Sequence, residues 1–181
     1  LDDAEEWVRF SAVEGLGFSG DSRAIGPLLA IIERDSGLIV EAAIEAVGKI
    51  ASSKDSVMVL EKIEGLIKSG LLFNISAVVE LMEKAQAPGS NFRPSPGFKE
   101  SYFNFFSNNL DDSEKSVQIK ALKGLGLLKL PEGLERVFKF SESLKELDEA
   151  TESLIVDSIV SITGSGPLPE ILKAELKKRG R

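Results

Sequence analysis

Apolar residues recur along this chain at helical spacing, and one ten-residue pattern returns five times. The pattern places a small residue four positions after its first apolar residue, and its best copies end in Gly-Leu-Gly. In the first copy, Val8, Ser11, Ala12, Gly15 and Leu16 share one face, because helical neighbours lie three and four positions apart. The copies occupy residues 8–17, 39–48, 73–82, 117–126 and 154–163. The spacing therefore predicts an amphipathic helix at each copy.

A second amphipathic segment follows each copy after a short break. No segment alternates with the period of two that a strand requires. The small residues that anchor the five copies are separated by steps of 31, 34, 44 and 37 residues: Ala12, Ala43, Ala77, Ala121 and Ser158. The helices predicted after the five copies are 22–34, 55–69, 98–109, 131–141 and 169–179. Ten helices in pairs, with a period in the thirties to forties, indicate a helical solenoid.

One stretch of the chain occurs a second time in similar form. Residues 1–17 read LDDAEEWVRFSAVEGLG and residues 110–126 read LDDSEKSVQIKALKGLG, with nine of seventeen positions identical. A repeat protein explains this duplication, since each repeat must present the same face to its neighbours. Asp2 with Glu5, and Asp111 with Glu114, have the spacing of capping boxes, so we expect them to cap helices rather than form paired-carboxylate active sites.

The segment GLGFSGDSRAIGPLLAIIERD, residues 15–35, resembles the HEAT repeat family. It is most similar to the HEAT-like repeats of phycobilin lyases and bacterial scaffold proteins, which share a Val-Arg…Ala…Leu-Gly helix and a Gly-Asp-x-Arg-Ala-Ile turn. The matching residues are Val8, Arg9, Ala12, Leu16, Gly17, Gly20, Asp21, Arg23, Ala24, Ile25 and Pro27. The resemblance implies an all-α, right-handed α-solenoid of about five helical hairpins, with the second helix of each pair on the concave side. It implies no catalytic residues, because the family motif is a packing motif.

The order of the helices also bears on domain organisation. The chain begins with the second helix of a pair and ends with the first helix of another. We therefore expect residues 1–181 to form a single repeat domain that is a slice of a longer protein, with an insertion loop at 85–97.

Composition narrows the chemistry further. The chain contains no Cys and no His, which excludes thiol nucleophiles, disulfides, imidazole bases and zinc sites built on these ligands. Its net charge of −7 disfavours binding to nucleic acid or anionic membranes, and no apolar run approaches the roughly 18 residues of a membrane span. No nucleotide-binding, nucleophile or metal-binding motif is present. We therefore predict a non-enzyme without cofactor or metal, in either the cytoplasm or the periplasm.

The strongest candidate for a binding surface is an apolar ladder along the concave face. HEAT-like repeats usually carry polar or small residues at the third and sixth pattern positions, yet nine of these ten residues are apolar here. They are Phe10, Glu41, Ile75, Ile119 and Val156 at the third position, and Val13, Ile44, Val78, Leu122 and Ile159 at the sixth. If exposed, the ladder would bind a partner helix or peptide, with Phe10 and Ile75 the best candidates for exposure. Alternatively, these side chains pack against the neighbouring helices and close the layer.

Three further segments could carry contacts. The insertion loop 85–97 presents Phe92 and Arg93, residue types favoured at binding hot spots, or it is a simple connector. The aromatic segment 98–106 either fills a core under that loop or lines a pocket for a small apolar ligand. The basic end, 173–181, either suits a helix C-terminus or touches an acidic partner.

These observations favour a protein-interaction scaffold that binds a partner segment on its concave face or its insertion loop. The resemblance to phycobilin lyases makes a bilin lyase or isomerase subunit the alternative. A HEAT-like alkylpurine DNA glycosylase is a remote third, since Glu14, Glu41 and Glu45 fall on the expected concave side, where such an enzyme presents basic residues.

Overall fold

A computed structural model describes residues 1–68, 74–90, 92–144 and 148–164 of the chain. These residues form nine α-helices and one 3-10 turn, without a strand among them. The all-α class is therefore confirmed. The tenth predicted helix, 169–179, and the basic end, 173–181, lie outside the described residues.

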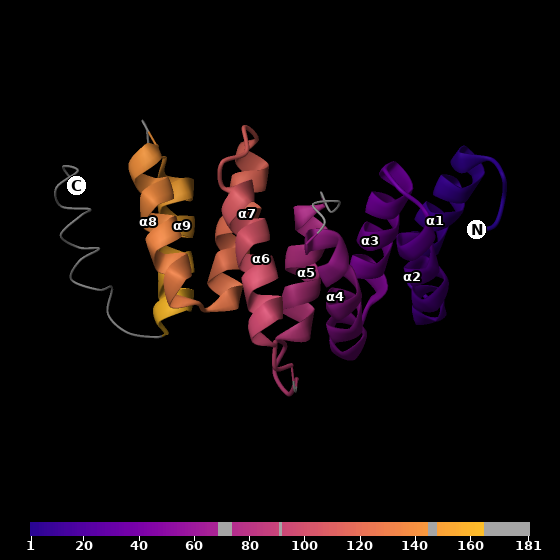
Figure 1. Cartoon of the computed structure of the whole chain (residues 1–181), viewed down its shortest axis with the longest axis horizontal. Coiled ribbons are helices and arrows are strands. Elements are labelled where there is room, and N and C mark those ends of the chain that lie inside the picture. Colours follow the sequence, from indigo (N-terminus) through magenta and orange to yellow (C-terminus); the bar gives the residue numbers. More distant parts are fainter. Residues whose placement is uncertain (69–73, 91, 145–147, 165–181) are drawn as a thin grey trace. The chain divides into compact units, whose positions relative to one another are not determined.

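The chain divides into two compact units, and the first runs from Leu1 to Tyr102. Its helices are α1 (Glu6–Ser19), α2 (Ile25–Arg34, preceded by the turn η1, Ser22–Ala24), α3 (Leu38–Ile50), α4 (Ser53–Lys68), α5 (Ile75–Ala85) and the first part of α6 (Pro96–Asn109). Within this unit α1 packs on α3 and α3 on α5, while α2 packs on α3 and α4 on α5 (Figure 1). This nearest-neighbour packing of hairpins is that of a helical-repeat solenoid.

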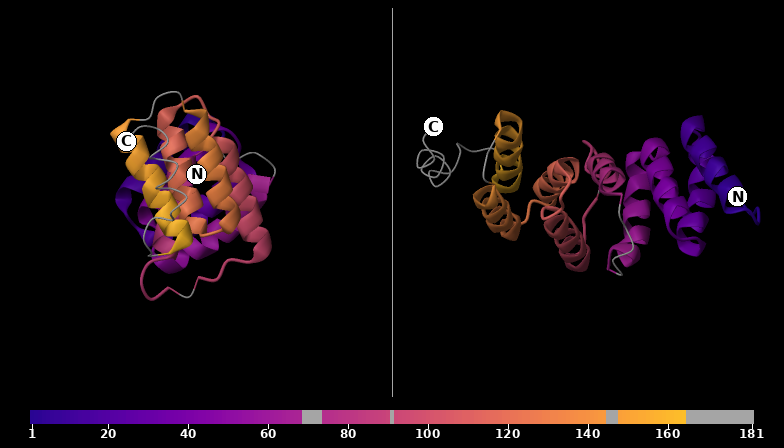
Figure 2. Two further views of the ribbon diagram at one scale, coloured as in Figure 1. Left: turned by 90° about the vertical axis from the view of Figure 1, so that its left-hand side faces the viewer. Right: turned by 90° about the horizontal axis from the view of Figure 1, so that it is seen from above.

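The second unit begins at Phe103, within α6. It contains α7 (Lys115–Leu128), α8 (Pro131–Ser143) and α9 (Glu149–Thr163). Here α7 packs on α9, and α8 packs on both of them (Figure 2). The pattern helices α7 and α9 thus meet as α1 and α3 do, which is the arrangement that the duplicated sequence requires.

Polar side chains at the helix starts explain where several helices begin. Asn74 Oδ1 accepts the N–H of Ala77 at 3.0 Å, and Asp148 Oδ1 accepts that of Thr151 at 3.0 Å. Asp21 accepts the N–H of Arg23 at 2.9 Å and so caps the turn before α2. A capping box does occur, but at α4, where Ser52 and Asp55 each accept the other's backbone N–H.

The duplicated acids do not form the predicted capping boxes. Asp3 instead accepts the N–H of Glu5 at 2.9 Å, and Asp112 accepts that of Glu114 at 2.7 Å. The aspartate before each of these two aspartates forms an ion pair with an arginine of a later helix: Asp2 with Arg34, and Asp111 with Arg136. The repeat is real, but its acids close turns and join helices, because α1 and α7 begin one residue after the predicted capping glutamates.

Close contacts between glycine and alanine set the register between pattern helices. A Cβ added to Gly17 would lie 2.9 Å from Cβ of Ala46, and one added to Gly48 would lie 3.5 Å from Cβ of Ala77. Each alanine follows its glycine by 29 residues, so Ala77 is the counterpart of Ala46 rather than of Ala43. The step into α5 is thus 31 residues rather than the 34 read from the sequence.

Aromatic side chains of α6 are core residues. This agrees with the expectation that segment 98–106 fills a core, rather than with the alternative of a ligand pocket. Phe98, Tyr102, Phe105 and Phe106 are all buried. Phe92 of the insertion loop packs edge-on against Phe98, with ring centroids 5.4 Å apart, and Phe98 stacks on Tyr102 at 4.1 Å. Tyr102 Oη donates a hydrogen bond to the carbonyl of Leu60 at 2.7 Å, which joins α6 to α4.

We expect the only tyrosine to ionise only when the first unit unfolds. Burial, with a smaller contribution from the charge of Glu64, raises the pKa of Tyr102 well above its ordinary value of 10.0. A pKa raised by folding means that the stabilisation is complete below pH 10 and is lost as the pH rises further, since the unfolded tyrosine then releases its proton. Tyrosinate absorbance should therefore appear together with the loss of helical circular dichroism.

Tyr102→Phe is the control for this titration. It should reduce the free energy of unfolding at neutral pH by about 1–2 kcal/mol, through loss of the buried hydrogen bond. It should also flatten the decline in stability above pH 10. Tyrosinate absorbance that rises near pH 10 in a fully helical wild-type protein would contradict this expectation.

Candidate functional site

Helix α1 carries large apolar side chains that its neighbours leave uncovered. Trp7 is 72% exposed and Phe18 is 79% exposed, while Phe10 is half-buried. The rings of Trp7 and Phe10 are stacked, with centroids 5.5 Å apart and an angle of 14°. Trp7, Phe10 and Phe18, together with Glu14, are three or four positions apart in sequence, so they share one face of α1. Val13 and Gly17 are buried instead.

An ion pair fixes the position of α1 against α2. The Arg9 guanidinium contacts Asp35 at 2.9 Å, and both side chains are largely buried. Arg9 also donates to the backbone carbonyls of Asp3 and Ala4, at the start of the helix. A largely buried pair with further hydrogen bonds holds geometry more firmly than an exposed pair does.

The opposing wall comes from α3. Gly37, with φ +62°, leads into α3 and leaves Leu38, its first residue, 67% exposed. Glu41 and Ala42 follow one helical turn later, and Glu45 and Lys49 continue the same stripe. This wall is apolar at its start and charged along the rest of its length.

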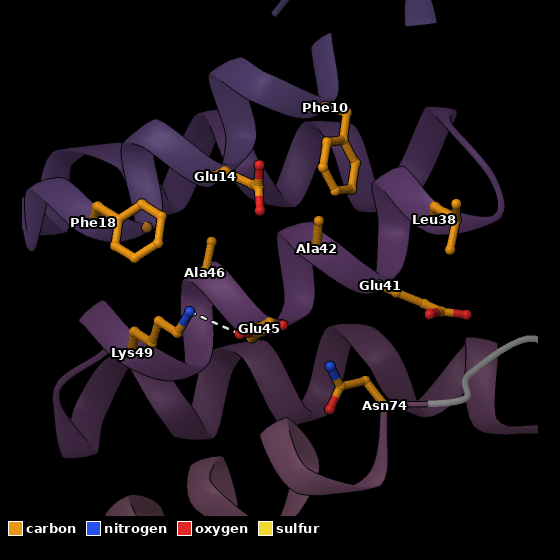
Figure 3. Close-up of a pocket in the computed structure, with 11 residues that line it drawn as sticks. Phe10, Glu14, Phe18, Leu38, Glu41, Ala42, Glu45, Ala46, Lys49 and Asn74 are labelled. Carbon is orange, nitrogen blue, oxygen red and sulfur yellow. Dashed lines mark ion pairs between the residues drawn. The ribbon is translucent and has the colours of Figure 1, made fainter. Parts of the chain in front are cut away.

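Together the two helices form a surface hollow of about 200 Å³, here called the α1–α3 groove. Its floor is the close approach of Gly17 to Ala46, where no larger side chain fits. Figure 3 shows Phe10 and Glu14 reaching from α1 towards α3, with Asn74 from the start of α5 at the lower side. The lining residues are Phe10, Glu14, Gly17, Phe18, Leu38, Glu41, Ala42, Glu45, Ala46, Lys49 and Asn74.

The groove carries more negative than positive charge. Lys49 is the only lysine among the described residues that line it. Lys49 contacts Glu45 at 2.7 Å and places its ammonium 5.1 Å from the centroid of the Phe18 ring. Among the described residues, no ion pair joins Glu14 or Glu41 to a cation. The surface therefore combines exposed aromatic rings with two carboxylates that have no cationic partner in the part of the chain that the structure describes.

Only some residues of the predicted apolar ladder are accessible at the surface. Val13, Ile44, Ile75 and Val78 are buried, so the expected exposure of Ile75 is wrong and these four side chains cannot contact a partner. The corrected register explains the error: Ile75 is the counterpart of Ile44 at the sixth position, which packs inward. The sixth-position residues Leu122 and Ile159 are buried too.

The other ladder residues remain partly accessible. Phe10 is half-buried in the α1–α3 groove, whereas Ile119 and Val156 are half-buried on α7 and α9 of the second unit. The structure thus brings one predicted ladder residue into a groove together with the glutamates that the sequence placed on the concave side. The sequence pattern did not indicate Trp7, Phe18 or Leu38 as binding residues. Trp7, Phe10, Glu14 and Phe18 form a second stripe at helical spacing on α1, and this stripe was the available signal for Trp7 and Phe18.

A second, larger hollow of about 740 Å³ lies between α4 and the insertion loop. Phe92 and Arg93 line it from the loop, and Lys54, Met58 and Glu61 line it from α4. Phe92 is half-buried because it packs on Phe98, whereas Arg93 is exposed. The two loop residues predicted to bind a partner therefore meet at one surface, with only Arg93 fully accessible.

The described residues lack two features of other kinds of protein. No group of three or more carboxylates there could hold a metal ion. No helix in the same residues has both the length and the apolar character needed to cross a membrane.

A comparison with protein families bears on the first pair of helices. Residues 8–34 match the PBS lyase HEAT-like repeat. The HEAT-like resemblance seen in the sequence is therefore confirmed for this segment. The match covers α1 from Val8 onward and all of α2, so the α1 wall of the groove lies within the matched segment. A search of curated proteins gave no match.

Proposed function

We propose that this chain is a non-catalytic interaction protein that binds a segment of another protein in the α1–α3 groove. The observation that carries this proposal is the exposure of Trp7, Phe18 and Leu38 around one hollow or at its edge. Contiguous exposed apolar surface marks interaction sites, and tryptophan is among the residues enriched at binding hot spots. Helical-repeat proteins commonly use such surfaces for binding.

Affinity capture from a lysate of the source organism tests this function. The wild-type chain should retain a partner that the Phe18→Ser, Leu38→Ser variant loses. Both side chains are more than two-thirds exposed, so the variant should keep the helical content of the wild type. A matched control is Val8→Ser, Met58→Ser, because these side chains are also exposed but do not line the groove.

Direct binding of the captured partner is then measured through Trp7. It is the only tryptophan of the chain, so its emission reports contact at the groove edge. A blue shift on titration with the purified partner is the expected result. The opposite result would be a partner that still binds Phe18→Ser, Leu38→Ser but no longer binds Val8→Ser, Met58→Ser. It would indicate that the binding site is the α4–loop hollow, which Met58 lines.

The family match favours a second candidate, a bilin lyase or isomerase subunit. The matching model describes a PBS lyase HEAT-like repeat, and its residues include the α1 wall of the groove. The glutamates of the groove count against this candidate, because linear tetrapyrroles carry carboxylates that these side chains would repel. Addition of a free bilin to the purified chain tests it: new absorbance or fluorescence supports a pigment site, and an unchanged pigment spectrum rejects it.

The acidic groove also argues against the remote DNA glycosylase candidate. Glu14, Glu41 and Glu45 would face a phosphate backbone there, at a cost in electrostatic energy. Retention on heparin at moderate salt would revive this candidate.

A further inference from the structure

We propose that the α1–α3 groove selects a basic amphipathic helix of its partner, with lysine or arginine placed beside apolar anchors. This inference rests on the proposed function and specifies the chemistry of the partner. It follows from Lys49, the only cation among the described residues that line the groove, and from two glutamates of the groove that form no ion pair with another described residue.

Lys49 shows how a cation is bound at one end of the groove. Its ammonium lies between the carboxylate of Glu45, at 2.7 Å, and the ring of Phe18, at 5.1 Å from the centroid (Figure 3). A cation held by a carboxylate and an aromatic face gains from both interactions. This end of the groove is therefore already satisfied.

The rest of the groove carries the same kinds of group, and Figure 3 shows Glu14 between Phe18 and Phe10 and Glu41 below Leu38. Glu14 lies one helical turn after Phe10, and Glu41 of α3 lines the same hollow. Trp7 stacks on Phe10 and extends the aromatic surface. Among the described residues, neither Glu14 nor Glu41 forms an ion pair. A lysine or arginine from a partner would pair with these carboxylates in the way that Lys49 pairs with Glu45.

The apolar surroundings require that the partner also carry hydrophobic side chains. Leu38 is 67% exposed at the start of α3, and Phe10 and Ala42 lie beside it in the groove. A helix supplies apolar residues on one face and cations at the edge of that face, which matches a groove between two helices. An acidic or wholly polar segment would leave the rings uncovered and place like charges together.

Two synthetic peptides test this selectivity. Both share leucines at helical spacing and contain no tryptophan; one carries lysines and the other carries glutamates at the remaining positions. Titration is followed by the fluorescence of Trp7. We expect the lysine peptide to bind the wild-type chain at least about ten-fold more tightly than the glutamate peptide, as two partly exposed ion pairs and a cation–π contact allow.

Glu14→Gln, Glu41→Gln should weaken binding of the lysine peptide about ten-fold. The matched control, Glu135→Gln, Glu142→Gln on α8, removes the same charge from exposed positions outside the groove and should leave the affinity unchanged. Equal losses in the two variants would show attraction to net charge alone and would overturn the inference. Equal affinity for the two peptides would overturn it as well.

The two proposals can fail separately. If a captured partner is lost from Phe18→Ser, Leu38→Ser but binds Glu14→Gln, Glu41→Gln as tightly as wild type, the groove is a binding site and the basic helix is wrong. Sedimentation of the free chain adds a further check. Self-association that Phe18→Ser, Leu38→Ser abolishes would make a second copy the occupant and would also overturn the basic-helix assignment.

Discussion

Gly17→Val should lower the free energy of unfolding by about 3 kcal/mol, near the upper end of the usual cost of overpacking. An added Cβ would lie 2.9 Å from Cβ and 3.0 Å from Cα of Ala46. Because one of these contacts is to backbone, a change of side-chain rotamer cannot relieve it. Helix α1 would have to move away from α3, and urea denaturation followed by circular dichroism measures the cost.

Gly15→Val is the matched control on the same helix. No atom lies within 4 Å of the added Cβ there, so stability should stay within about 0.5 kcal/mol of wild type. Adding Ala46→Gly to Gly17→Val should restore part of the lost stability, since it removes one of the two contacts. A Gly17→Val protein as stable as the Gly15→Val protein would show that the close approach of α1 and α3 is not required.

Gly124→Ala should destabilise the second unit by about 1–3 kcal/mol, through overpacking of its core. An added Cβ would overlap the ring of Phe106, which is fully buried and packs edge-on against Phe105 at 5.3 Å. The ring cannot swing aside without displacing other core side chains. The cost therefore exceeds the gain of up to about 1 kcal/mol that alanine brings over glycine within a helix.

A double-mutant cycle with Phe106→Leu tests this interpretation. The smaller side chain leaves room for the new methyl group, so Gly124→Ala should cost at least about 1 kcal/mol less in the Phe106→Leu background than in wild type. Gly65→Ala on α4 is the control, because its added Cβ meets no atom within 4 Å and should be neutral or stabilising. Additive effects of Gly124→Ala and Phe106→Leu would contradict the proposed overlap.

Much of the fold could be predicted from the sequence because helical periodicity is a local property. The observed bounds of α3, α4 and α8 lie within two residues of the predicted ones. The HEAT-like turn at 15–35 was recognisable for the same reason, and the family match at 8–34 confirms it. The capping boxes failed because spacing alone does not say whether an acid bonds to its own helix or to an arginine of the next helix.

The candidate site was predicted less well. The sequence indicated Phe10 as a binding residue, and it placed Glu14, Glu41 and Glu45 on the expected concave side only as an argument against DNA binding. These residues all line the α1–α3 groove. It also indicated Ile75, which is buried. The third copy of the pattern, residues 73–82, has apolar residues on more than one side of the helix. Several alignments with the other copies therefore fit it equally well. Only the contact of Ala77 with Gly48 distinguishes them.

The sequence by itself determined that this chain is a series of amphipathic helices in repeated pairs, because periodicity and helix-breaking residues act within each segment. Tertiary structure decided which side of each helix faces water. On α1, apolar residues lie on both sides, and the packing of α3 against Gly17 buries Val13 while leaving Trp7 and Phe18 exposed. That choice depends on close contacts between segments about 30 residues apart in the chain, which the pattern within one helix does not contain.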